Sequence, residues 1–222
     1  MIKRAIVFGE YNTANYGWTL AGWQLSPAEQ KTNFVERTGG DGSWDLSTAL
    51  TDGQPRYYDR TLTVRLERSD HDRLYREVDV CDIVNQLDGT RKNITLPDDA
   101  DHYLTGRLHV AREYNDPAHA AVTVTAVCDP WKYSTQEKTV RLTAAATQKT
   151  TYLQNTGRRA VVPVLTVSGT STSVHLTFGG QSWALGAGTY QLPDILLTPG
   201  SHALTYQGTG TLIVTYREAV LE

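Results

Sequence analysis

The sequence has little cysteine and no long apolar run. The first argues against a zinc or redox site, and the second argues against a membrane protein. Its 222 residues include two cysteines, Cys81 and Cys128, without the paired spacing of zinc or redox motifs. We therefore expect two buried free thiols rather than a disulfide. The longest apolar runs, such as residues 160–165, are broken by proline and fall far short of the roughly 20 residues that a membrane helix needs. We expect no membrane insertion.

An excess of positive charge is also absent. The formal net charge is −3 and the isoelectric point is about 6.1, which leaves no basic surplus to neutralise a phosphate backbone. We expect no nucleic-acid recognition. The first 30 residues lack a continuous apolar core after Lys3 and Arg4, so we expect synthesis without a signal peptide.

The common catalytic motifs are missing from the sequence. It contains no Gly-x-Ser-x-Gly elbow, Walker loop, His-Glu-x-x-His helix or Cys-x-x-Cys pair. We expect a protein that is not an enzyme, with no catalytic residue, cofactor or metal ion. The densest group of potential metal ligands is Asp98, Asp99, Asp101 and His102. It follows a proline at a turn and lacks the spacing of a calcium loop, so a solvated loop is favoured over a cation site.

Alternation with period two dominates the chain and predicts a mainly β protein. Leu62, Val64 and Leu66 alternate with polar residues, as in a strand with one face buried. Valine, threonine and tyrosine fill these runs, as strands prefer. The same pattern recurs at Val122, Val124 and Cys128, at Val174, Leu176 and Phe178, and at Leu212, Val214 and Tyr216.

One segment instead has a spacing of three to four and predicts a single substantial helix near residues 70–87. Ser69 is the expected N-cap and Gly89 stands where the helix would end. The residues expected to face the core are Leu74, Val78, Cys81 and Val84 or Asn85.

Composition changes after Cys128 and predicts two domains. A Pro-aromatic-Lys segment at residues 129–133 closes a strand, and residues 143–151 are small and polar. Short apolar runs with Gly or Pro-Gly turns follow, which is typical of an antiparallel sandwich. We assign residues 1–135 to an N-terminal β-barrel or β-sandwich domain containing the helix, and residues 136–222 to a C-terminal antiparallel β-sandwich.

Two features have functional alternatives. Gly39, Gly40 and Gly42 with Asp41 could cradle an anion, but a flexible turn or an inter-subunit loop is favoured. Trp183 and Tyr190 are candidates for stacking against a sugar ring. Large aromatics also fill cores and interfaces, and that interpretation is favoured.

Several stretches together resemble the distal tail protein family of long-tailed phages. In the first domain these are residues 40–47, 57–67, the helix, Ile94 to Leu96 with Tyr103 and Gly106-Arg107, and the closing segment 129–133; in the second they are residues 155–157, 163–169, 179–180, 196–200 and 216–218. The resemblance runs along nearly the whole chain.

The resemblance implies a virion structural protein at the distal end of the tail. Its N-terminal domain would form a ring, usually a homohexamer, single or double, and its C-terminal domain would be a galectin-like β-sandwich. The ring would be a hub that joins the tail tube protein to the tail-tip or baseplate protein and to receptor-binding or tail-fibre proteins. Synthesis would take place in the host cytoplasm. The alternative function is a carbohydrate-binding β-sandwich module that recognises host-surface glycans.

A ring requires a segment that can reach a neighbouring subunit. The hairpin that we expect around Glu113, Tyr114, Asn115, Asp116 and Pro117 is the candidate inter-subunit arm.

Overall fold

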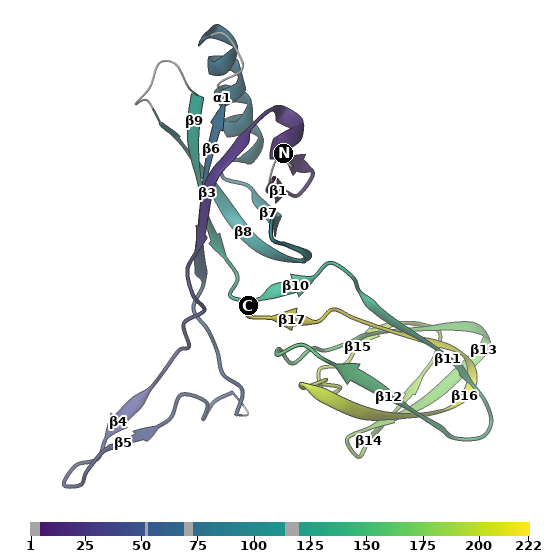
Figure 1. Ribbon diagram of the computed structural model, residues 1–222. Coiled ribbons are helices and arrows are strands. Elements are labelled where there is room, and N and C mark those ends of the chain that lie inside the picture. The colour runs from purple at the N-terminus through teal and green to yellow at the C-terminus, as the bar shows by residue number, and fades with distance from the viewer. Residues whose placement is uncertain (1–4, 52, 69–72, 114–119) are drawn as a thin grey trace. The chain divides into compact units, whose positions relative to one another are not determined.

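The computed structural model describes residues 5–51, 53–68, 73–113 and 120–222 (Figure 1). The chain divides into two compact units, Met1–Lys132 and Tyr133–Glu222. Both consist mainly of antiparallel strands, and the described residues contain one α-helix. The predicted mainly β fold class with a helix in the first part is therefore confirmed. No helix in the described ranges is long and apolar enough to span a membrane.

Unit 1 is organised around one antiparallel sheet whose strands run in the order β2-β1-β7-β8-β9-β6-β3. These strands are β1 (Val7–Phe8), β2 (Tyr11–Asn12), β3 (Thr19–Leu25), β6 (Arg60–Arg68), β7 (Arg91–Leu96), β8 (Asp99–Glu113) and β9 (Ala120–Cys128); a 3-10 helix, η1 (Thr13–Tyr16), follows β2. Leu62, Val64 and Leu66 are fully buried. The strand predicted from their alternation with polar residues is therefore confirmed as β6, because side chains along a strand point alternately to its two faces.

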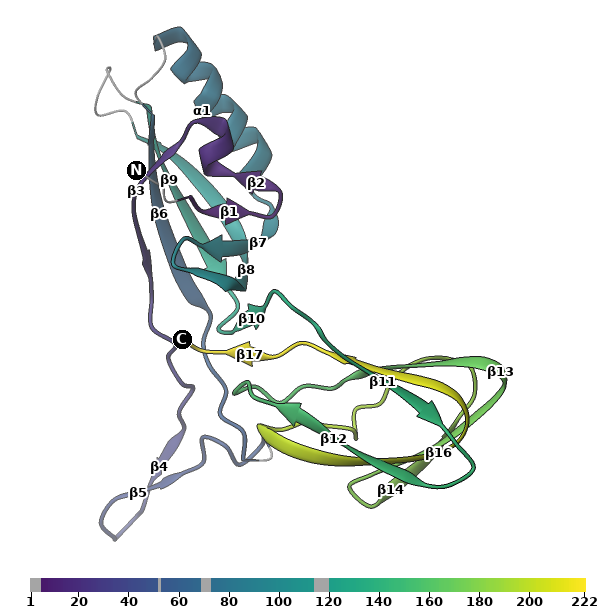
Figure 2. The same ribbon diagram turned by 45° about the vertical axis from the view of Figure 1, so that its right-hand side comes forward.

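Helix α1 (Arg73–Leu87) packs against β8 and β9 of this sheet, and Figure 2 shows it beside them. Its buried residues are Val80, Ile83 and Leu87. The predicted core face was wrong for Val78, which is 52% exposed, and for Cys81, which is exposed. It was right for Val84, which packs against the core. Apolar residues recur at a spacing of three to four on two faces of the helix. The face that carries Val80, Ile83 and Leu87 is the one that packs against the sheet. The predicted start, residues 69–72, lies outside the described residues.

The two cysteines differ in environment. Cys128 is buried on β9, as predicted, and burial, reinforced by the nearby Asp129 carboxylate, raises the pKa of its thiol to about 12. The expectation that Cys81 is buried was wrong, because this residue lies on the outward side of α1. Both thiols are free.

Unit 2 is a sandwich of two layers that share two long strands. Its strands are β11 (Lys138–Ala144), β12 (Lys149–Asn155), β13 (Val164–Phe178), β14 (Gln181–Leu185), β15 (Gly188–Gln191) and β16 (Gly200–Tyr216). Two short strands outside this sandwich, β10 (Lys132–Ser134) and β17 (Ala219–Val220), pair with each other. In layer A, the first half of β13 pairs with the second half of β16, and β15 and β11 flank these two strands. In layer B, the second half of β13 pairs with the first half of β16, and β14 and β12 flank them. The inner side chains of both layers form one hydrophobic core.

The long strands change layer at a corner. The register of β13 against β16 shifts between Ser168 and Ser173. Gly208 lies opposite Val174 with a φ of +123°, and a Cβ there would lie 2.0 Å from the carbonyl oxygen of Ser173. The corner therefore requires glycine both for its backbone angle and for the close approach of two strands.

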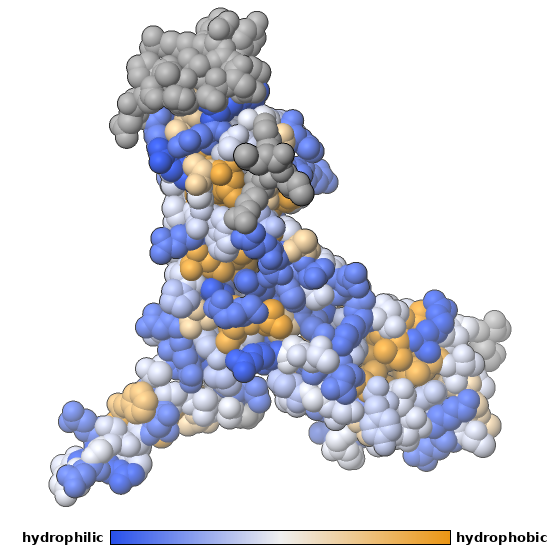
Figure 3. All heavy atoms as spheres, viewed as in Figure 1, coloured by the Kyte–Doolittle hydropathy of each residue, from blue (hydrophilic) through white to orange (hydrophobic). Residues whose placement is uncertain are grey.

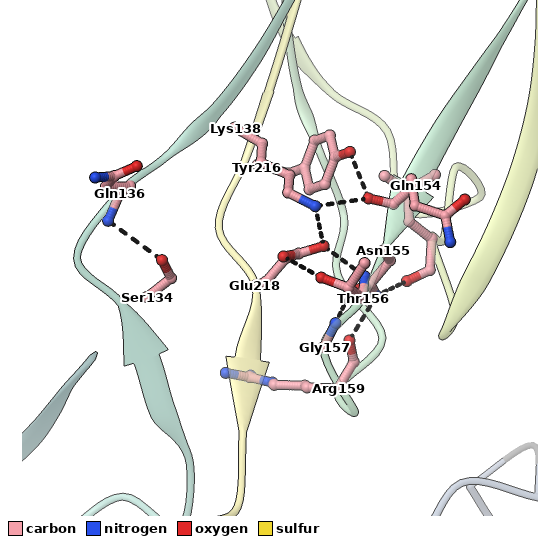
Figure 4. Close-up of polar contacts among 11 residues, drawn as sticks. Ser134, Gln136, Lys138, Gln154, Asn155, Thr156, Gly157, Arg159, Tyr216 and Glu218 are labelled. Carbon is pink, nitrogen blue, oxygen red and sulfur yellow. Dashed lines mark hydrogen bonds and ion pairs between the residues drawn. The ribbon is translucent and has the colours of Figure 1, made fainter. Parts of the chain in front are cut away.

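A polar cluster ties the last segment of unit 2 to its loops (Figure 4). The Glu218 carboxylate lies 2.7 Å from Lys138 Nζ and accepts hydrogen bonds from the backbone N–H and the hydroxyl of Thr156. Tyr216 donates a hydrogen bond to the Gln154 carbonyl at 2.8 Å. Although partial burial opposes the charge, the hydrogen bonds from Lys138 and Thr156 hold the pKa of Glu218 below its usual range.

We expect Glu218→Gln to lower the free energy of unfolding of unit 2 by about 1.5–3 kcal/mol, since the hydrogen bonds to a charged group are lost or weakened. Because the folded pKa is depressed, the wild-type contribution is fully present above the ordinary pKa of 4.5 and is lost as the pH falls through the lower folded pKa. Urea unfolding at several pH values tests this. Glu137→Gln is the control, because Glu137 is half exposed and lies 4.0 Å from Arg217. Equal losses in the two variants would contradict the assignment.

Candidate functional site: an exposed hairpin arm

Residues 26–61 leave the end of β3 and return into β6 as a long arm, which Figures 1 and 2 show carrying β4 and β5 away from the sheet of unit 1. The base is held by Ser26, whose carbonyl accepts a hydrogen bond from the Arg60 guanidinium at 2.7 Å and whose hydroxyl accepts one from Thr61 N–H at 2.9 Å. Arg60 is only 2% exposed. A buried cation therefore fixes where the arm starts.

The middle of the arm is a two-stranded hairpin. Strands β4 (Phe34–Glu36) and β5 (Ser43–Asp45) pair in antiparallel register, with Val35 opposite Trp44. The connecting turn contains Gly39 and Gly42, both with positive φ near +76 to +79°. The turn predicted from these glycines is therefore confirmed, and the element directly after it is strand β5.

Apolar side chains of the arm are unusually exposed. Every residue from 31 to 46 is exposed. Of the large hydrophobic side chains exposed in the described residues, six lie in the arm, and Figure 3 shows one apolar patch on it among mainly hydrophilic residues. They are Phe34, Val35, Trp44, Leu46, Leu50 and Tyr58. Large apolar side chains gathered on a protruding segment mark an interaction surface.

One face of the hairpin carries a continuous apolar stripe. Val35 and Trp44 are directly opposite each other, and Leu46 donates its N–H to the Asn33 carbonyl at 2.8 Å, which continues the pairing. Since side chains alternate along a strand, Val35, Trp44 and Leu46 share one face and Phe34 lies on the other. The Arg37 guanidinium lies 5.5 Å from the centre of the Trp44 ring. We call Val35, Trp44 and Leu46 the arm stripe.

The arm has few contacts that could hold it in shape by itself. A lone two-stranded hairpin is marginally stable in water, and no residue of β4 or β5 is buried. The Asp45 carboxylate accepts hydrogen bonds from Ser47, which hold its pKa below the usual range. The stripe is thus an aromatic and aliphatic surface in need of a partner, as in the centres of protein interfaces.

The site residues predicted from the sequence lie elsewhere. Of the candidate inter-subunit arm, Tyr114, Asn115, Asp116 and Pro117 lie outside the described residues. Glu113 ends β8, where its carboxylate pairs with Arg65 at 3.1 Å.

The two aromatic candidates for sugar stacking lie on the inner side of the sandwich. Trp183 is directly opposite Leu176 and Tyr190 is opposite Leu165, and both leucines are fully buried. Residues that face each other across a ladder share a side of the sheet. Both aromatics accordingly pack against the core of unit 2.

The acidic group at residues 98–102 was expected to be a solvated loop, and it is divided between a turn and a strand. Asp98 is exposed in the turn, and the residues from Asp99 onward belong to β8. Asp99 begins β8, and its carboxylate lies 2.8 Å from His102 Nδ1 and 3.1 Å from Lys132 Nζ. Although burial opposes the charge, hydrogen bonds from His102 and Lys132 hold the pKa of Asp99 below its usual range. The described residues contain no group of three side chains placed to hold a metal ion.

A solved structure matches the chain over almost its entire length. The SPP1 Dit protein aligns with 96% of this chain and 98% of its own, with a TM-score of 0.70 and 17% sequence identity. The chain has the fold of a siphophage distal tail protein. The resemblance inferred from the sequence is confirmed at the level of the Dit fold. The SPP1 Dit structure is described as a paradigm of the hub of the adsorption apparatus in phages that infect Gram-positive bacteria. No family model and no curated protein sequence matches the chain.

Proposed function

We propose that this chain is a structural protein of a phage tail, in which copies assemble into a hexameric ring, single or double, at the distal end. The ring is the hub that joins the tail tube protein to the tail-tip protein and to receptor-binding or tail-fibre proteins. Its role is structural rather than catalytic. The Dit fold, matched over both chains almost completely, is the observation that carries this proposal.

The arm stripe supports the assembly of identical copies. A closed ring is built from heterologous contacts, in which a surface of one subunit meets a different surface of the next. A protruding arm with exposed Val35, Trp44 and Leu46 supplies one half of such a contact without disturbing the core of its own subunit. We propose that each arm binds the neighbouring subunit of the ring.

The solution mass tests the ring. We expect the purified chain, in a concentration series by light scattering coupled to size exclusion, to have the mass of six or twelve chains. Twelve would indicate two rings back to back. A mass of one chain at every concentration would contradict a ring that forms without tail partners.

A further inference from the structure

The outer face of layer B in unit 2 combines features that play no part in the proposed contact of the arm stripe. A small open pocket lies there, lined by Gln148, His175, Thr177, Thr205, Tyr206 and Gln207. The lining contains no carboxylate, lysine or arginine side chain. Gln148, His175 and Gln207 make no side-chain hydrogen bond or ion pair to the rest of the described chain, and all three are exposed. The pocket therefore presents unused amide and imidazole groups.

The pocket is set in an ordered row of hydroxyl groups. Thr150, Thr205, Thr177 and Ser182 are successive partners across β12, β16, β13 and β14. Thr150 and Thr205 approach to 3.1 Å, and Thr177 and Ser182 to 2.9 Å. Each hydroxyl group has one donor and two acceptor positions, so these pairs leave further capacity facing the solvent. Strands on a shared core hold the row rigidly.

An exposed aromatic ring stands beside this row. Tyr152 is 71% exposed and lies two residues from Thr150 on β12, hence on the same face of layer B. Its partner across the ladder is Ala203, a small side chain that leaves the ring face accessible. A tyrosine ring on a flat sheet offers an apolar surface against which the C–H groups of a pyranose ring can pack.

From this combination we propose that the outer face of layer B binds a neutral glycan. Sugar hydroxyl groups both donate and accept hydrogen bonds, as the amides and hydroxyls of the pocket do. Phosphate or carboxylate ligands would call for arginine or lysine, and the pocket lining has neither. Tyr152 packs against one sugar ring, and Gln207, His175 and Gln148 hold hydroxyl groups further along the glycan. This site is separate from the inward-facing Trp183 and Tyr190.

Saturation-transfer difference NMR on the full-length protein tests the proposal, because the method suits weak ligands on a large assembly. The probes are maltose, cellobiose, lactose and N,N′-diacetylchitobiose. We expect saturation transfer to at least one of them, strongest at the C–H protons of one ring. Tyr152→Ala should weaken binding about threefold to tenfold, as expected for the loss of one stacked ring, and Tyr152→Phe should retain it.

The opposite layer offers a matched control. Thr166 and Thr189 form the same kind of cross-strand hydroxyl pair on layer A, at 3.4 Å. Thr205→Val should weaken binding and Thr189→Val should leave it unchanged. Absence of transfer to all four sugars, or equal transfer in wild type and Tyr152→Ala at unchanged solution mass, would overturn the glycan site. Neither result would change the solution mass of the protein. The glycan site can therefore be disproved without disproving the proposed hub role, and the reverse also holds.

Discussion

Replacing Trp44 and Leu46 with serine is expected to convert the proposed ring into single chains. The two residues are 55% and 43% exposed, so the folded subunit gains little from their side chains. In the proposed ring, their burial against a neighbour would supply binding energy. Truncating a tryptophan at the centre of an interface costs about 2–4 kcal/mol, and every contact around a closed ring is weakened at once. Light scattering at fixed concentration measures the mass of the variant.

Two controls separate the arm stripe from general effects. Leu50→Ser removes a side chain that is 99% exposed and lies outside the hairpin, and we expect the ring to persist. The variant that carries both Trp44→Ser and Leu46→Ser should still unfold in a cooperative thermal transition, since no core residue changes. A double variant that keeps the full ring mass would show that another surface, such as residues 113–117, makes the contact.

Gly208→Ala is expected to be the most destabilising single substitution in unit 2. The new methyl group would lie 2.0 Å from the Ser173 oxygen and 3.3 Å from the Val174 Cα, so two paired strands would have to separate at the corner. The φ of +123° is also unfavourable for alanine. Together these effects place the loss at about 4 kcal/mol or more, in the exceptional range for a point mutation. Hydrogen exchange of peptides from β13 and β16 measures it.

Gly200 provides a closely matched comparison. Its φ is +122°, but a Cβ there would meet no atom within 4 Å. Gly200→Ala therefore measures the cost of the backbone angle alone, about 1–3 kcal/mol. Exchange in β6 of unit 1 should be unchanged in both variants. If the two alanine variants lost equal stability, the close approach at the corner would contribute nothing.

The strands were predictable because their signal is local. At residues 62–66 the alternation of leucine and valine with polar residues predicts both a strand and the face of it that is buried, and the structure confirms both. The presence of the helix could be predicted from the sequence, but the face that it buries could not. Both the stripe through Val78 and Cys81 and the stripe through Val80, Ile83 and Leu87 satisfy a helical period, and only the position of the sheet decides between them.

The arm was harder to predict for a related reason. Its glycine turn was visible at residues 39–42, but Phe34, Val35, Trp44 and Leu46 look like core residues in a sequence. Nothing local says that they are exposed, because exposure depends on the absence of a facing layer. The same ambiguity affected Trp183 and Tyr190, whose neighbours across the ladder, Leu176 and Leu165, determine which way they face.

The strands shared by the two layers of unit 2 also have a mechanical consequence. Strand β16 pairs with β11, β12 and β13, and β13 pairs in turn with β14 and β15. A load applied along β16 is therefore spread over three neighbouring ladders and both layers, and neither layer can peel away while the strand remains intact. A body of this kind transmits force as a single block, a property that the proposed hub would use when a load passes through it.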